Sequence, residues 1–195
     1  MPTGIALRDA REQLFAAAER VLLREGANAL TSRAVTTEAG VAKGLLHRHF
    51  ADFDDFLVQF VLDRIGRIEA QAIALRESAG TGTVVDNLTR TLTDLFASIA
   101  LKIVGLVISR DAVRTRLREV TGGGIPVLRE ATDMIRSYLG VERERGRVAA
   151  DADIEALAPT LIGAAHLLFA GGEDTPPATG EVEKVVTTVI ADTAV

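Results

Sequence analysis

Apolar side chains recur along this chain at intervals of three and four residues, and this spacing constrains its fold more than any other feature. The first such face is formed by Leu14, Phe15, Ala18, Val21 and Leu22. The spacing returns in the segments 52–68, 88–107, 126–144, 153–170 and 181–193. Such spacing is typical of amphipathic helices, whereas strands alternate with a period of two. The sequence therefore predicts an all-α fold with about nine helices.

The residue composition narrows the possible classes of function. Hydrophobic residues make up 48% of the 195, which is too many for a disordered chain. The chain has no cysteine, so disulfides, zinc–thiolate sites and cysteine nucleophiles are excluded. The sequence also shows no nucleophile elbow, phosphate loop or metal-ligand spacing. We therefore expect neither an enzyme nor a bound metal or cofactor.

The placement of charged residues bears on location in the cell. The N-terminal residues carry charges where a signal peptide has an apolar run. The most apolar stretch, Leu95–Ile108, is interrupted by Lys102 and is shorter than the about 20 residues that span a bilayer. We expect a cytoplasmic protein with no membrane segment.

The segment from Thr31 to Phe50 has the pattern of a helix-turn-helix. Thr31 can cap a short helix that runs to about Glu38, residues 39–41 form an Ala-Gly-Val turn, and a third helix follows over about 42–49. The predicted buried face consists of Val35, Ala39, Val41, Leu46 and Phe50. This pattern makes a helical hairpin that packs against the first helix.

The outer face of the third helix is predicted to be basic. No acidic residue lies between Glu38 and Asp52. Residues 1–50 hold seven Lys/Arg against five Asp/Glu, whereas the whole chain has a net charge of −5. A basic face on a short helix suits the major groove of DNA. The spacing alone equally permits a three-helix packing unit with no role in DNA binding.

Residues 10–60 resemble the TetR (tetracycline-repressor) family of regulators. The resemblance rests on LTSR at 30–33 and on AGVAKGLLHRHF at 39–50, which combine a threonine cap, an AGV turn and a short helix ending in His-Phe. It implies DNA contacts by Thr31, Ser32, Arg33, Ala42, Lys43, Gly44, Leu45, His47, Arg48 and His49. For His49, a hydrogen bond that only pins the helix is an open alternative. The sequence departs from the family pattern at Leu45, His47 and Phe53, which favours weaker binding to the DNA backbone or an unusual operator.

The same resemblance implies two domains, a helix-turn-helix domain at 8–68 and a ligand-binding and dimerisation domain at 69–195. In a homodimer the helices 153–170 and 181–193 would pair with their copies. Candidate interface residues are Val182, Val185, Val186, Val189 and Ile190. Candidate residues of a hydrophobic ligand pocket are Phe60, Leu92, Phe96, Ile99, Met134, Tyr138, Leu161 and His166. Packing in the core is the alternative for each of them.

The function implied by the resemblance is that of a ligand-responsive transcriptional regulator, a repressor. It would bind a palindromic operator in double-stranded DNA as a homodimer, and a hydrophobic small molecule would release it. The alternative is a helical protein–protein adaptor of the same fold that has lost DNA binding.

Overall fold

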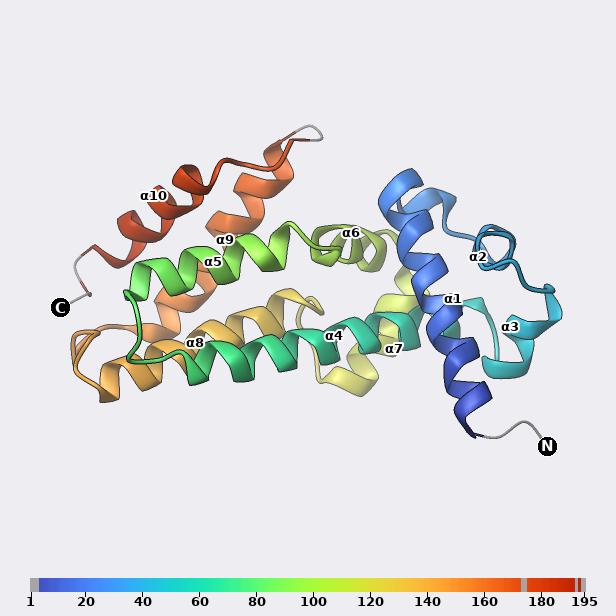
Figure 1. Cartoon of the computed structure of the whole chain (residues 1–195), viewed down its shortest axis with the longest axis horizontal. Coiled ribbons are helices and arrows are strands. Elements are labelled where there is room, and N and C mark those ends of the chain that lie inside the picture. Colours follow the sequence, from blue (N-terminus) through green and yellow to red (C-terminus); the bar gives the residue numbers. More distant parts are fainter. Residues whose placement is uncertain (1–3, 173–174, 192, 194–195) are drawn as a thin grey trace. The chain divides into compact units, whose positions relative to one another are not determined.

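The computed structural model describes residues 4–172, 175–191 and 193. Over these residues the chain forms ten α-helices, one short 3-10 helix and no β-strand (Figure 1). The elements are α1 Gly4–Glu25, η1 Ala27–Ala29, α2 Ser32–Glu38, α3 Gly44–His49, α4 Phe53–Glu77, α5 Val84–Phe96, α6 Ala100–Ser109, α7 Asp111–Thr121, α8 Leu128–Glu144, α9 Ile154–Gly171 and α10 Thr179–Ile190. The predicted all-α class is confirmed.

The predicted helix at 88–107 is two helices, α5 and α6, which is why ten helices are observed in place of about nine. The chain leaves the helix at residues 97–99. There the hydroxyl of Ser98 donates to the carbonyl of Leu95 (2.5 Å) and accepts from the amide of Ala100 (3.3 Å). Short polar side chains that bond to nearby backbone compete with the helical ladder in this way. The apolar spacing continues across the break, so it conceals the interruption.

The described chain divides into two compact units. The first consists of Met1–Asp63 with Lys102–Gly123, and the second of Arg64–Leu101 with Gly124–Val195. The division therefore falls inside α4, and α7 belongs to the same unit as the helix-turn-helix. The functional domains 8–68 and 69–195 stay a prediction, because a packing unit need not coincide with a functional domain.

The core of the first unit is built around phenylalanine rings. The Phe15 ring lies 5.9 Å from Phe50, 5.6 Å from Phe56 and 5.8 Å from Phe60, measured between centroids. All four side chains are buried. Since Phe15 comes from α1, Phe50 follows α3 and the other two lie in α4, the cluster joins three parts of the helical unit. Aromatic pairs at these separations add stability beyond the area that they bury.

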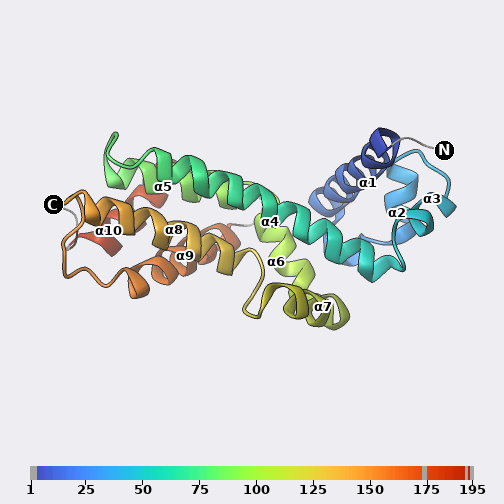
Figure 2. The same cartoon turned by 90° about the horizontal axis from the view of Figure 1, so that it is seen from below.

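The second unit is held together by α9, which packs against α5, α8 and α10 (Figure 2). By length and composition alone, α9 is long and apolar enough to cross a membrane. The core helix of a soluble protein passes the same test, and α9 buries residues such as Leu161, Ala165 and Phe169 against its neighbours. The apolar stretch 95–108 does not form one helix, because it is divided between α5 and α6.

The last helix, predicted at 181–193, is observed at 179–190, and residue 192 lies outside the described residues. Within it Val182, Val186 and Ile190 are buried in the single chain, where α10 packs on α5 and α9. Val185 and Val189 are half-buried. The apolar stripe of α10 therefore packs mainly into the core of one chain. Only Val185 and Val189, at the edge of the stripe, are accessible to a second copy.

Candidate nucleic-acid interface

The segment 31–50, called the reading segment below, forms the predicted helix-turn-helix. The hydroxyl of Thr31 accepts a hydrogen bond from the amide of Ala34 (3.1 Å), so Thr31 caps α2. Gly40 has a φ of 67°, a left-handed conformation that glycine adopts without strain. The amide of Val41 then bonds to the carbonyl of Thr36 (3.0 Å), which closes the turn. Local sequence signals thus produce the two short helices and the angle between them.

One side of the reading segment is buried. Val35 and Leu46 are fully buried, Ala39 and Phe50 are nearly so, and Val41 is half-buried. These are the five residues predicted for the inner face. Because α2 and α3 together have only 13 residues, their conformation depends on this packing and not on helix propensity.

The opposite side of the segment carries most of the predicted DNA contacts. The exposed members are Thr31, Arg33, Ala42, Lys43, Gly44, His47 and Arg48, and the half-buried ones are Ser32, Leu45 and His49. The side chains before and within α3 include Lys43 and Arg48, and Ala42 and Gly44 leave the start of α3 without bulk. Such a face can approach the floor of a groove closely.

Two of the predicted contact residues have side chains that are partly covered by, or in contact with, other parts of the protein. The hydroxyl of Ser32 is buried and has no hydrogen-bond partner among the described residues. The ring of His49 lies 6.3 Å from that of Phe50, between centroids. No hydrogen bond of the His49 side chain is found in the described part of the chain, so the alternative role of pinning the helix has no support.

The acids that border the reading segment are paired with arginines. Glu38 binds Arg20 (2.6 Å) and Arg24 (3.0 Å), and these hydrogen bonds, with Arg20 first, hold its pKa below the ordinary value. The carboxylate of Asp52 accepts hydrogen bonds from Nη1 and Nη2 of Arg116 (2.8 and 2.9 Å). The hydrogen bond from Arg116 is the main reason that the pKa of Asp52 falls to about 2. The negative charge next to the basic face is therefore neutralised locally.

Sequence reasoning missed Arg110 and Arg116 as neighbours of this segment. Arg110 donates to the carbonyl of Leu30 (2.7 Å), and its guanidinium lies 5.7 Å from the centroid of the Phe53 ring. Phe53 stacks on Phe56 at 5.6 Å. The departure at Phe53 thus has a structural role, since the ring joins the aromatic core. The contacts of Arg110 and Arg116 join residues that are 57 or more positions apart in the sequence, so no local pattern predicts them.

Of the eight residues predicted for a ligand pocket, Met134 lines a hollow between α4 and α8. Phe60 belongs to the first unit, and the others to the second. All except His166 are buried and fill the cores of their units. His166 is half-buried, its ring lies 5.9 Å from Phe96, and its Nδ1 has no partner among the described residues. Burial in the core is what the alternative interpretation expects, and a role of these residues in a ligand pocket stays a prediction.

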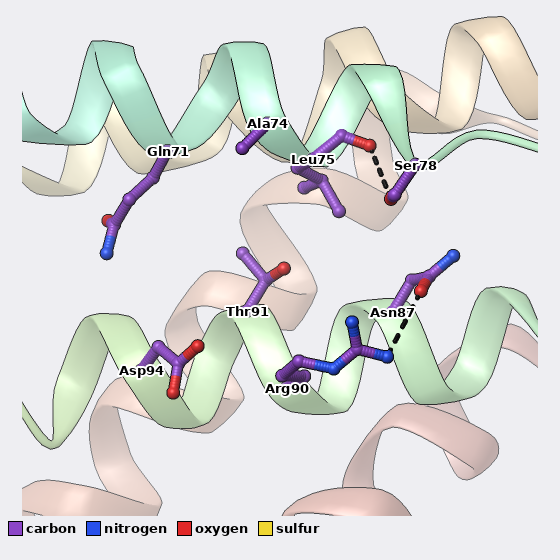
Figure 3. Close-up of a pocket in the computed structure, with 8 residues that line it drawn as sticks. All are labelled: Gln71, Ala74, Leu75, Ser78, Asn87, Arg90, Thr91 and Asp94. Atoms are coloured by element: carbon purple, nitrogen blue, oxygen red, sulfur yellow. Dashed lines mark hydrogen bonds between the residues drawn. The ribbon is translucent and has the colours of Figure 1, made fainter. Parts of the chain in front are cut away.

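A cavity of about 170 Å³ lies instead between α4 and α5 (Figure 3). Its lining consists of Gln71, Ala74, Leu75, Ser78, Asn87, Arg90, Thr91 and Asp94. In the figure the side chains of Gln71 and Asp94 lie on opposite helices beside the same space, and Arg90 donates to Asn87 (3.4 Å). Six of the eight lining residues are polar or charged, and they include one cation and one anion.

Comparisons with known proteins agree with this geometry. Residues 14–59 match the bacterial regulatory proteins of the tetR family. An uncharacterized HTH-type transcriptional regulator of Haemophilus influenzae is 40% identical over 55 residues, which are 28% of this chain and 29% of that protein. The matched segment thus spans less than a third of the relative.

Solved structures extend the likeness to the whole fold. A TetR-family transcriptional regulator from Agrobacterium tumefaciens has a TM-score of 0.72 at 14% identity, covering 97% of this chain and 100% of that one. Reduced NemR of E. coli has a TM-score of 0.72 at 17% identity, covering 95% and 98%. FadR of Bacillus subtilis has a TM-score of 0.68 at 16% identity, covering 92% and 97%. Residues 14–59 thus match the tetR family of bacterial regulatory proteins, and the whole chain has a fold similar to that of solved TetR-family transcriptional regulators.

Proposed function

We propose that this chain is a ligand-responsive transcriptional regulator that binds double-stranded DNA through the outer face of the reading segment. The observation that carries the proposal is the exposed pair Lys43 and Arg48 on a face whose bordering acids, Glu38 and Asp52, are both paired with arginines. Basic side chains on a short exposed helix neutralise phosphates and reach base edges in the major groove. Repression is the expected direction of regulation.

A homodimer on a palindromic operator is part of the proposal. The outward side of α9 is apolar and lined by small residues: Ala156, Pro159, Gly163, Leu167 and Ala170 are all exposed. Leu167 is 72% exposed, which is unusual for a leucine in the middle of a helix. A second copy packed on this face would bury it and bring two reading segments into one assembly, as a palindromic operator requires.

The ligand of the proposed regulator is a small molecule. The solved FadR of Bacillus subtilis is in complex with stearoyl-CoA, which supports ligand binding in a chain of this fold. The ligand is expected to bind one of two conformations better than the other and so to lower the affinity for the operator. A hydrophobic ligand was expected from the sequence, and the mixed lining of the cavity between α4 and α5, which includes Arg90 and Asp94, favours a ligand that also carries polar groups.

DNA binding can be measured with fragments of the host genome. Fragments retained by the purified protein give a duplex, whose affinity is then followed by fluorescence anisotropy over a range of salt. For a protein that binds DNA phosphates, the logarithm of the affinity falls steeply and linearly with the logarithm of the salt concentration. Lys43→Ala and Arg33→Ala should each weaken binding while the helical circular dichroism signal stays unchanged.

Two results would contradict the proposal. Absence of retained fragments, or an affinity independent of salt, would favour the adaptor that has lost DNA binding. A duplex affinity that no small molecule from the host extract changes would remove the ligand-responsive part and leave DNA binding in place.

A further inference from the structure

Two arginines of the α7 region contact the two ends of the reading segment. Arg110, the residue before α7, donates through Nη2 to the carbonyl of Leu30 (2.7 Å). Arg116, in the middle of α7, donates through Nη1 and Nη2 to both carboxylate oxygens of Asp52 (2.8 and 2.9 Å). Leu30 directly precedes the segment 31–50, and Asp52 follows it by two residues. The contacts therefore flank the segment on both sides.

Each contact acts on the start of a helix. Leu30 is fully buried and precedes Thr31, the cap of α2. Asp52 accepts from the amide of Asp55 (2.6 Å) and so caps α4, while the carboxylate of Asp55 accepts from the amide of Ala51 (2.9 Å). A guanidinium that binds a carboxylate with two parallel bonds fixes the direction of that carboxylate. Arg116 therefore sets the orientation of the residue from which α4 begins.

The ion pair is too exposed to be mainly a source of stability. The side chains of Arg116 and Asp52 are 42% and 49% exposed, and pairs of this kind contribute little to the free energy of unfolding. The bond from Arg110 is different, because it satisfies the carbonyl of a buried residue. Both bonds nevertheless restrain where the reading segment begins and ends.

We propose that α7 is a positioning element for DNA binding, with Arg110 and Arg116 as its positioning residues. They hold the reading segment in its binding geometry without contacting DNA themselves. This rests on the proposed function, since it assumes that the segment binds a duplex. Residues 110 and 116 lie far outside the matched segment 14–59, so the sequence likeness does not assign them this role.

A positioning role differs measurably from a phosphate contact. Loss of a cationic side chain that binds a phosphate lowers the slope of log affinity against log salt by about one unit. Loss of a positioning arginine lowers the affinity and leaves the slope unchanged. A merely structural role lowers the melting temperature and leaves the affinity of the folded protein unchanged.

The test uses the full chain and the duplex selected by the wild-type protein. Arg116→Gln and Asp52→Asn are compared singly and together, because asparagine still caps a helix but cannot form the ion pair. Each single variant should bind about tenfold more weakly, and the double variant no more weakly than either. Arg118→Gln is the matched control, since Arg118 is exposed on the same helix. Its affinity should equal that of the wild type.

A slope that falls by about one unit in Arg116→Gln would overturn the proposal, because Arg116 would then bind a phosphate. Unchanged affinity in Arg116→Gln, or losses that multiply in the double variant, would overturn it as well.

A second measurement does not depend on DNA. Hydrogen–deuterium exchange should become faster at the amides of residues 32–38 in Arg110→Gln and of residues 53–57 in Arg116→Gln, but not in Arg118→Gln. If the wild-type protein bound no duplex, the proposed function would fail, and this exchange would still decide whether α7 orders the segment. Unchanged exchange in both variants would overturn the positioning role.

Discussion

The hydroxyl of Tyr138 donates a hydrogen bond of 2.7 Å to the carboxylate of Glu142 one turn later in α8, and both side chains are fully buried. The same carboxylate accepts from the backbone amide of Gly80 (3.2 and 3.3 Å) and pairs with Arg147 (3.4 Å). Asn87 donates to the Tyr138 hydroxyl (3.0 Å). Burial, and then the bond to Glu142, raise the pKa of Tyr138. Tyr138 thus belongs to a satisfied buried network, although it was predicted as a ligand anchor.

Replacing Tyr138 by phenylalanine should therefore destabilise the fold. The buried amide of Asn87 and carboxylate of Glu142 each lose a partner, which costs about 1–3 kcal/mol in the free energy of unfolding. Chemical denaturation measures this loss. Thr132→Ala is a suitable control, because the Thr132 hydroxyl on the same helix bonds only one turn back, to Leu128. Unchanged stability together with loss of a ligand response would instead return Tyr138 to the role of ligand anchor.

The ion pair of Asp52 predicts how stability depends on pH. The pKa of Asp52 is lowered to about 2, from an ordinary value of 3.8 in the unfolded chain. A carboxylate with a lowered folded pKa stabilises the fold above the unfolded pKa and loses this contribution as pH falls through the folded pKa. Because the pair is half-exposed, the melting temperature of the wild type should exceed that of Asp52→Asn only slightly at pH 6, and the difference should shrink between about pH 4 and pH 2. A difference that stays constant over this range would mean that the charge of Asp52 contributes nothing.

Local signals made much of the helix-turn-helix predictable. Thr31 caps α2 and Gly40 takes a positive φ, because each property depends on a residue and its immediate neighbours. The break between α5 and α6 was missed because the hydroxyl of Ser98 overrides an apolar pattern that continues through it. The contacts of Arg110 and Arg116 join residues 80 and 64 positions apart, and one sequence has no signal for them.

The ligand site shows a second limit of sequence reasoning. A buried apolar residue and a residue that lines an apolar pocket follow the same helical spacing. The spacing of Leu92, Phe96 and Leu161 was therefore consistent with either role, and all three are buried in the structure. The lining of the cavity between α4 and α5 comes from facing positions that depend on how the two helices pack.

The exposed face of α9 predicts the oligomeric state. Leu167→Glu places a charge in the centre of that face, so it should convert the expected homodimer to a monomer in sedimentation velocity. The matched control is Val120→Glu, because Val120 is also exposed (65%) but lies on α7. The control should sediment like the wild type. A Leu167→Glu protein that remains dimeric would exclude this face as the interface.

Alanine substitutions at two glycines of the reading segment should change the free energy of unfolding in opposite directions. A Cβ at Gly40 or at Gly44 would meet no atom within 4 Å, so neither alanine variant clashes with the protein. Gly40 has a φ of +67°, and Gly40→Ala should lower the free energy of unfolding by about 1–2 kcal/mol through backbone strain. Gly44 is the first residue of α3, and Gly44→Ala should raise the free energy of unfolding by up to about 1 kcal/mol.

The same two variants should also differ in their affinity for the DNA duplex. Gly44 is exposed at the start of α3, where the proposed function brings the backbone close to the groove, so the methyl group of Gly44→Ala should weaken duplex binding in a more stable protein. Gly40→Ala, once corrected for its folded fraction, should bind closer to the wild type. Urea denaturation and fluorescence anisotropy on the same samples measure both quantities. Wild-type affinity in Gly44→Ala would show that the start of α3 does not approach the DNA.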